Sequence, residues 1–204
     1  MTSFKRGIIL ISVEDNPTGL DDFQYLYSKG WTFLATEKTA AALLALEIHS
    51  TVVPQLFDVA KPSSVHKSIL DLDILDIVSH NLDDEAQMES LRLRGLKPVD
   101  IVVASLPEAN SDGLDVTKEE ASLHSLITTA SRNLKNVTVL VDPHDYKQTV
   151  DEMASRGVGS VSKKTREDLA AKAVGYLYDR DKETISWLAQ TGFGGMGMDP
   201  FLLC

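Results

Sequence analysis

The sequence predicts an α/β fold with a doubly wound, mainly parallel β-sheet and helices on both faces. Continuous aliphatic runs at 7–13, 100–104 and 136–142 are typical of strands that are buried on both faces. Each run is followed by turn residues and then by apolar residues at helical spacing. This alternation of strand and helix favours a parallel sheet with right-handed crossovers.

Residues 7–53 contain the first units of this alternation. After the strand at 7–13, a helical pattern continues to Lys29, and Gly30 suits the end of that helix. The next expected elements, in chain order, are a strand at 31–35, a helix at 39–45 and a short β-branched strand at 51–53.

Residues 55–81 fit both helical and strand periodicity, because aspartates alternate with aliphatic residues there. One interpretation of Asp71, Asp73 and Asp76 is a site for a hard cation. Calcium and magnesium sites usually have a denser set of oxygen ligands at defined spacing. We therefore expect a solvated acidic face and no metal.

The last predicted helix covers 165–188, with Thr165 as its N-cap and Asp168 three residues later. We expect it to close a single domain that spans residues 1–190. Residues 191–204 form a tail rich in glycine that also carries apolar residues. This tail is either without stable structure or docked on a partner, such as a second copy of the chain.

Composition excludes several classes of partner. The 204 residues include 30 acidic and 20 basic ones, and a formal net charge of −10 opposes binding to nucleic acid. We expect neither a membrane-spanning segment nor a signal peptide. The single cysteine, Cys204, gives no disulfide framework, so a cytoplasmic location is expected.

The turn from Thr36 to Thr39 is the strongest candidate for a ligand site. It lies between a predicted strand and a predicted helix, where backbone N–H groups and the positive end of the helix dipole favour an anion. It contains no glycine, although glycine allows the closest approach of backbone to phosphate.

Several segments together resemble the IMP cyclohydrolase domain of the bifunctional enzyme of purine biosynthesis. The resemblance runs from about residue 7 to about residue 188, and the segments that carry it are 11–13, 18–20, Thr36 with Thr39, 99–103, 133–137, 141–146 and 165–173. It implies a methylglyoxal synthase-like fold with a phosphate site at the carboxyl edge of the sheet. The implied reaction is an intramolecular ring closure of a formylated imidazole nucleotide, without metal or organic cofactor.

The resemblance places the ligand site on four residues: Ser12, Thr36, Lys38 and Thr39. Glu37 and Lys38 stand where the family has glycines, and a carboxylate repels phosphate. Two interpretations of the turn remain open. Its hydroxyls keep a weakened phosphate site, or Thr39 only caps the following helix.

The resemblance assigns catalytic roles to Lys67 and Arg132. Lys67 matches the position of a family lysine, and ordinary surface exposure is the alternative for it. Arg132 replaces another family lysine, with the same charge and a different shape. The family's catalytic tyrosine and aspartate have no counterpart here.

We therefore expect a divergent relative that is impaired in ring closure and binds a nucleotide-like ligand or a protein. The ligand would be a purine-precursor nucleotide or another phosphorylated small molecule. A homodimer or another protein partner could be held through the tail. The alternative is an active enzyme that closes the formylated imidazole nucleotide or carries out a related reaction.

Overall fold

The computed structural model describes residues 6–13, 17–53, 72–107, 118–157 and 159–190, and its centre is a parallel five-stranded sheet. The strand order is β3-β2-β1-β4-β5, and every neighbouring pair is parallel. The strands are Ile8–Val13 (β1), Thr32–Ala35 (β2), Thr51–Val52 (β3), Ile101–Ser105 (β4) and Thr138–Leu140 (β5). The predicted α/β fold is confirmed.

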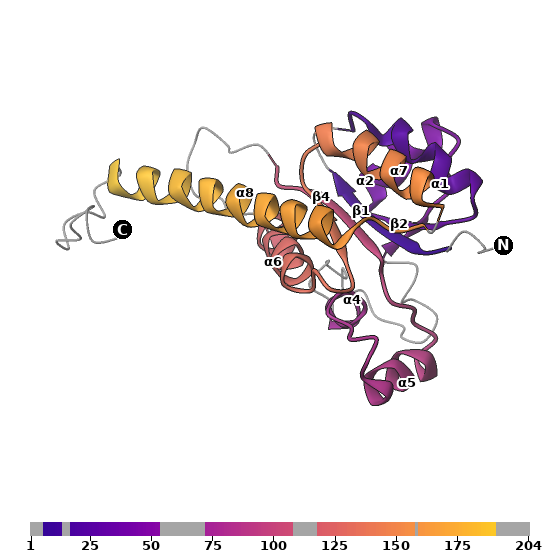
Figure 1. Cartoon of the computed structure of the whole chain (residues 1–204). Coiled ribbons are helices and arrows are strands. Elements are labelled where there is room, and N and C mark those ends of the chain that lie inside the picture. The colour runs from indigo at the N-terminus through magenta and orange to yellow at the C-terminus, as the bar shows by residue number, and fades with distance from the viewer. Residues whose placement is uncertain (1–5, 14–16, 54–71, 108–117, 158, 191–204) are drawn as a thin grey trace.

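Helices cover both faces of the sheet (Figure 1). One face carries a 3₁₀ turn and three helices: Leu20–Phe23 (η1), Gln24–Ser28 (α1), Glu37–Ala45 (α2) and His144–Arg156 (α7). On the other face the described residues form Leu72–Val78 (α4), Lys118–Arg132 (α6) and Lys163–Gln190 (α8), and Glu85–Leu93 (α5) lies beyond α4. The sheet is therefore doubly wound.

The aliphatic run of β1 serves both faces because successive side chains of a strand point in opposite directions. Ile9 and Ile11 belong to the core beneath α1, α2 and α7. Leu10 belongs to the core beneath α4, α6 and α8. All three are fully buried. The continuous run, rather than an alternating one, follows from this double burial.

The strand order places a topological switch next to β1. From β1 the chain continues outward through β2 and β3, and it later returns to the other side of β1 as β4, followed by β5. In such sheets ligands bind beyond the carboxyl ends of the strands at the switch point. The ends of β1, β2 and β4 are therefore where a site is expected.

Helix α8 begins earlier than the sequence indicated. The Ser162 hydroxyl accepts a hydrogen bond from the Thr165 N–H at 3.1 Å, so Ser162 is the N-cap. Thr165 as N-cap was wrong by one turn, because two hydroxyl residues stand three apart and either fits the capping pattern. Helix α8 packs on α6 and β5, with ion pairs to α6 as far along as Arg180 and Asp181, and its C-terminal end extends away from the sheet (Figure 1).

The acidic residues of α4 are held by a cation from α5. Arg94 Nη1 lies 2.8 Å from an Asp73 oxygen and 2.9 Å from an Asp76 oxygen. Among the described residues, no group of three or more His, Cys, Asp or Glu side chains is placed to hold a metal ion. Asp71 lies outside the described residues.

Candidate functional site

Three of the predicted ligand residues meet at the carboxyl edge of the sheet. Ser12 lies near the end of β1, Thr36 follows β2, and Thr39 lies in the first turn of α2. The β1–β2 register pairs Ile11 with Ala35, which brings the two strand ends together. Ser12 and Thr39 are fully buried, and Thr36 is half-buried.

The hydroxyls of these three residues form a relay that ends on the backbone of β1. Ser12 Oγ donates to Thr36 Oγ1 over a long 3.5 Å, and Thr36 Oγ1 donates to Thr39 Oγ1 at 2.9 Å. Thr39 Oγ1 in turn donates to the Val13 carbonyl at 3.1 Å and accepts from the Val13 N–H at 3.0 Å.

The Thr39 hydroxyl has no remaining capacity for a ligand. A hydroxyl offers one donor and two acceptor lone pairs, and Thr39 uses all three. Its function in this structure is to clamp the end of β1 to the start of α2. The prediction that Thr39 caps the helix was wrong, because Thr39 lies inside α2 and its side chain points at β1.

Helix α2 begins without a side-chain cap. Its N-cap residue is Thr36, whose extended backbone (φ −66°, ψ 161°) makes the turn and whose side chain makes no capping hydrogen bond. The Thr36 carbonyl accepts the first helical bond, from Ala40 at 2.8 Å. Glu37 and Lys38 are exposed in the first turn. The Glu37 carboxylate thus stands at the end of the helix that favours an anion.

A second polar cluster, which the sequence did not indicate as a site, follows β5 at the same edge. Lys172 Nζ donates to Asp142 and to Asp145 at 2.7 Å each. The His144 N–H also donates to Asp142, at 2.9 Å. The hydrogen bond from Lys172 holds the pKa of Asp142 far below its usual range, and this outweighs the opposing effect of burial. Asp142 is therefore a carboxylate at neutral pH.

Tyr146, in the first turn of α7, carries a buried hydroxyl that has no hydrogen-bond partner among the residues that the structure describes. Its ring packs on Phe23, with ring centroids 5.1 Å apart, and beside Gly19. Burial, and then the Asp142 carboxylate, raise the pKa of Tyr146, so its phenol stays protonated.

We expect Tyr146→Phe to raise the free energy of unfolding by about 1 kcal/mol, because it removes a buried, unpaired polar group. Tyr176→Phe is the matched control, since the Tyr176 hydroxyl accepts a hydrogen bond from the Leu106 N–H at 2.9 Å. That control should lose about 1 kcal/mol. Urea unfolding of both variants measures the difference. A loss for Tyr146→Phe would contradict the assignment.

Sequence could have indicated this second cluster by position alone. Asp142 follows a predicted strand, and residues after parallel strands gather at the carboxyl edge. Its link to Lys172 depends on the packing of α8 against β5, which no local pattern shows.

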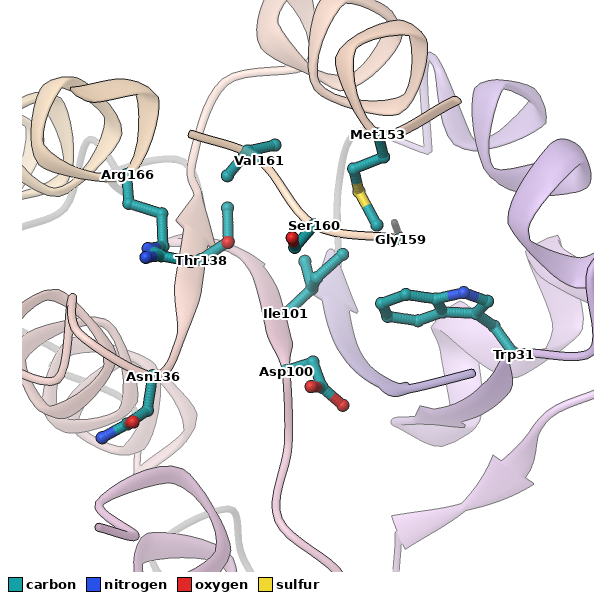
Figure 2. A pocket seen from close by; sticks show the side chains of 10 residues that line it. All are labelled: Trp31, Asp100, Ile101, Asn136, Thr138, Met153, Gly159, Ser160, Val161 and Arg166. Carbon is teal, nitrogen blue, oxygen red and sulfur yellow. The ribbon is translucent and has the colours of Figure 1, made fainter. Parts of the chain in front are cut away.

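A small pocket lies at the opposite edge of the sheet, where the strands begin (Figure 2). Its volume of about 40 Å³ suits ordered water and is far below that of a nucleotide site. Trp31 and Arg166 line it from opposite sides, and within the described part of the chain neither Trp31 Nε1 nor Arg166 Nε has a hydrogen-bond partner. Water in this pocket would pair such donors. The pocket shares no residue with the predicted site.

Arg132 belongs to that opposite edge as well. It is exposed in the last turn of α6, just before β5 begins at Thr138. Thr138 pairs with Ile101, which pairs with Ile9 at the start of β1. The backbone of Arg132 therefore lies away from Thr36, and the structure does not bring the two together. Lys67 lies outside the described residues.

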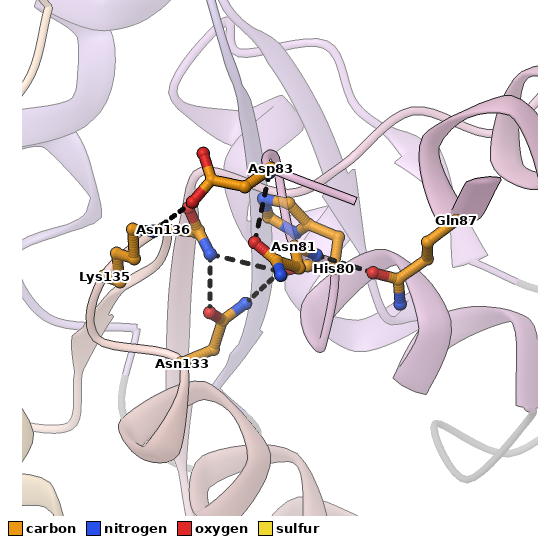
Figure 3. Close-up of polar contacts among 7 residues, drawn as sticks. All are labelled: His80, Asn81, Asp83, Gln87, Asn133, Lys135 and Asn136. Carbon is orange, nitrogen blue, oxygen red and sulfur yellow. Dashed lines mark hydrogen bonds and ion pairs between the residues drawn. The ribbon is translucent and has the colours of Figure 1, made fainter. Parts of the chain in front are cut away.

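The residues after Arg132 form a structural network (Figure 3). The Asn133 side chain donates to the carbonyls of Val78 and His80 at 2.8 Å each. The Asn136 side chain donates to the Asn133 side chain at 2.9 Å and to the His80 carbonyl at 3.2 Å. These amides hold the end of α4 against the turn before β5, which explains asparagine at both positions without a ligand.

Comparison with known proteins agrees with the fold. The family model described as "AICARFT/IMPCHase bienzyme" matches residues 130–198. The "Crystal structure of ForH" superposes with a TM-score of 0.73 at 21% identity, over 89% of this chain and 100% of that one. No helix among the described residues is long and apolar enough to cross a membrane.

Curated relatives carry the name "Bifunctional purine biosynthesis protein PurH". The protein from Chlorobaculum parvum is 31% identical over 89% of this chain and 36% of its own length. That from Thermoanaerobacter sp. is 39% identical over 48% of this chain and 21% of its own length. The chain thus spans about a third or less of these relatives. Together the sequence matches support an IMP cyclohydrolase-like domain that is similar to part of these purine biosynthesis proteins.

Proposed function

We propose that this domain binds a purine-precursor nucleotide, or another phosphorylated small molecule, weakly at the start of α2 and is impaired in ring closure. The observation that carries the proposal is the saturated Thr39 hydroxyl beside an uncapped helix start. The Thr39 hydroxyl is used up in hydrogen bonds within the chain and cannot bind a ligand, whereas the backbone N–H groups at the start of α2 can still donate to one.

Two features support residual phosphate binding. The first N–H groups of a helix have no acceptor within the helix, and the side chain of the N-cap residue of α2, Thr36, satisfies none of them. Lys38 adds a positive charge in the same turn.

Two features support low affinity. Glu37 is exposed at the first position of α2, where its charge repels a phosphate and already benefits from the helix dipole. The turn also has side chains where glycine would let the backbone approach. Both effects act at one residue, so Glu37 is the residue to change.

Impaired catalysis is supported by the separation of the predicted site residues. Ring closure needs the nucleophile and the electrophile pressed together, with proton donors at the developing oxyanion. Arg132 lies at the other edge of the sheet from the Thr36 turn. The family's aspartate and tyrosine have no counterpart at the matching positions of this sequence.

Thermal shift with purine nucleoside monophosphates, the aminoimidazole carboxamide ribonucleotide and inorganic phosphate tests the binding proposal. A ligand at 100 times its dissociation constant stabilises a protein by about 2.7 kcal/mol. We expect a small shift with the unchanged chain and a larger one with Glu37→Gly. Glu37→Gln separates the effect of charge from that of backbone freedom.

Glu85→Gly is the matched control, because Glu85 is the exposed first residue of α5, another nine-residue helix. It should respond to ligands as the unchanged chain does. If neither the unchanged chain nor Glu37→Gly shifts with any compound, the phosphate site does not exist.

A further inference from the structure

Helix α8 has apolar side chains on a face that is turned away from the core. Leu169, Ala173 and Leu177 of this helix are buried against the domain. Val174 and Tyr178 stand four residues apart on another face, and they are 55% and 59% exposed. The outer face of such a helix is ordinarily polar. These two side chains therefore begin a stripe of α8 that the described residues leave exposed.

Lys182 continues the stripe one turn after Tyr178. Its ammonium lies 5.2 Å from the centre of the Tyr178 ring and 3.7 Å from the Asp179 carboxylate. Both members of the pair with Asp179 are exposed, and such a pair contributes little stability. From Val174 onward the stripe is thus aliphatic, then aromatic, then cationic, with a step of four residues, or about 6 Å along the helix.

The sequence that follows α8 contains a complementary series in reverse order. Asp199, Phe201 and Leu203 are two residues apart from one another. In an extended chain alternate side chains point to the same side, with a step of about 6.6 Å. This step nearly equals that of the stripe. A segment antiparallel to α8 would therefore set its aspartate against Lys182, its phenylalanine against Tyr178 and its leucine against Val174.

The connecting chain is long enough for this return. Lys182 lies eight residues before Gln190, where α8 ends, which is about 12 Å along the helix. Residues 191–198 span up to about 26 Å when extended. Four of these residues are glycines, which suit a reversal of the chain. Pro200 then favours extended backbone for itself and for the residue before it.

We propose that residues 199–203 bind along the stripe formed by Val174, Tyr178 and Lys182 of the same chain, antiparallel to α8. The agreement in charge, order and spacing favours this segment over a partner of unrelated sequence. Its short covalent connection holds it at an effective concentration on the order of millimolar, so weak contacts are enough to bind it.

A nitroxide attached to Cys204 tests the proposal in the full chain, because Cys204 is the only cysteine. Docking brings this residue back to the level of Val174. We therefore expect the label to broaden the amide NMR signals of residues 172–178 more strongly than those of residues 186–190. Broadening that is strongest at 186–190, the residues nearest to the tail in sequence, would overturn the proposal.

A mixed sample separates the same chain from a second copy. It contains nitroxide-labelled chains without ¹⁵N and ¹⁵N-labelled chains without nitroxide. We expect no broadening of residues 172–178 in this mixture. Broadening there would place the tail on another copy and would contradict docking within one chain.

Two substitutions test the apolar contact. Tyr178→Glu and Phe201→Glu should each reduce the broadening at residues 172–178 several-fold. Circular dichroism should show Tyr178→Glu folded, because the Tyr178 side chain is exposed. Leu93→Glu is the matched control, since Leu93 is 74% exposed on α5, and it should leave the broadening unchanged. Undiminished broadening in both test variants would overturn the proposal.

Charge reversal tests the register of the segment. Lys182→Glu should weaken the broadening, because it sets two carboxylates against each other, and Asp199→Lys in the same chain should restore it. A double variant that is no better docked than Lys182→Glu alone would contradict the register.

Discussion

Replacing Thr39 with valine is expected to lower the free energy of unfolding by about 2 to 3 kcal/mol. Valine has nearly the same shape but no hydroxyl, so the Val13 N–H and carbonyl lose the partner that they share in the buried relay. Thr36 loses its acceptor as well. Removal of the Thr39 hydroxyl has this large effect on the free energy of unfolding because it leaves buried polar groups without hydrogen-bond partners.

Urea unfolding measures this loss, and two controls separate its causes. Thr39→Ser keeps the hydroxyl and should lose less than half as much. Thr36→Val removes a half-buried hydroxyl that contacts only other side chains, so its loss should be about 1 kcal/mol or less. A loss below about 0.5 kcal/mol for Thr39→Val would mean that Val13 has other partners.

The sheet was predictable because its pattern is local. The aliphatic run of β1 and its repetition in β4 and β5 follow from burial on both faces, and this requires only the residues of each strand. Helix ends were less predictable. Ser162 and Thr165 are both good caps by type, and the choice between them depends on where Glu152, which accepts from Ser162 N and from Thr165 Oγ1, is placed by α7.

The role of the Thr36 turn could not be predicted from its residues. A threonine three residues into a helix is equally suited to capping, to a phosphate or to a clamp on another strand. The clamp depends on the β1–β2 register, which brings Val13 within 3.0 Å of Thr39. The location of Arg132 could not be predicted from its sequence neighbours either. It lies at the edge of the sheet opposite the Thr36 turn because of the direction in which α6 runs.

Single-turnover measurement with the synthetic formylated imidazole nucleotide is expected to give a ring-closure rate of about 10⁻³ per second or less. Typical enzymes turn over at about 1 to 10³ per second. Each missing oxyanion donor lowers the rate by about 10² to 10³. The family's tyrosine, which is one such donor, has no counterpart here, and neither has its catalytic aspartate, so we expect a rate several orders of magnitude below that range. A rate near 1 per second would show that the chain is an active cyclohydrolase.

Variants connect this rate to the geometry. Arg132→Ala should leave the rate unchanged, because the Arg132 backbone lies at the opposite edge of the sheet from the Thr36 turn. Glu37→Gly should strengthen binding without restoring the rate, since it removes a repulsive charge and supplies no proton donor. A rate that falls tenfold in Arg132→Ala would place its guanidinium at the reacting atoms. Arg132 would then act in catalysis although it lies at the opposite edge of the sheet from the Thr36 turn. We expect instead that the turn contributes to phosphate affinity alone and that Arg132 contributes to neither affinity nor rate.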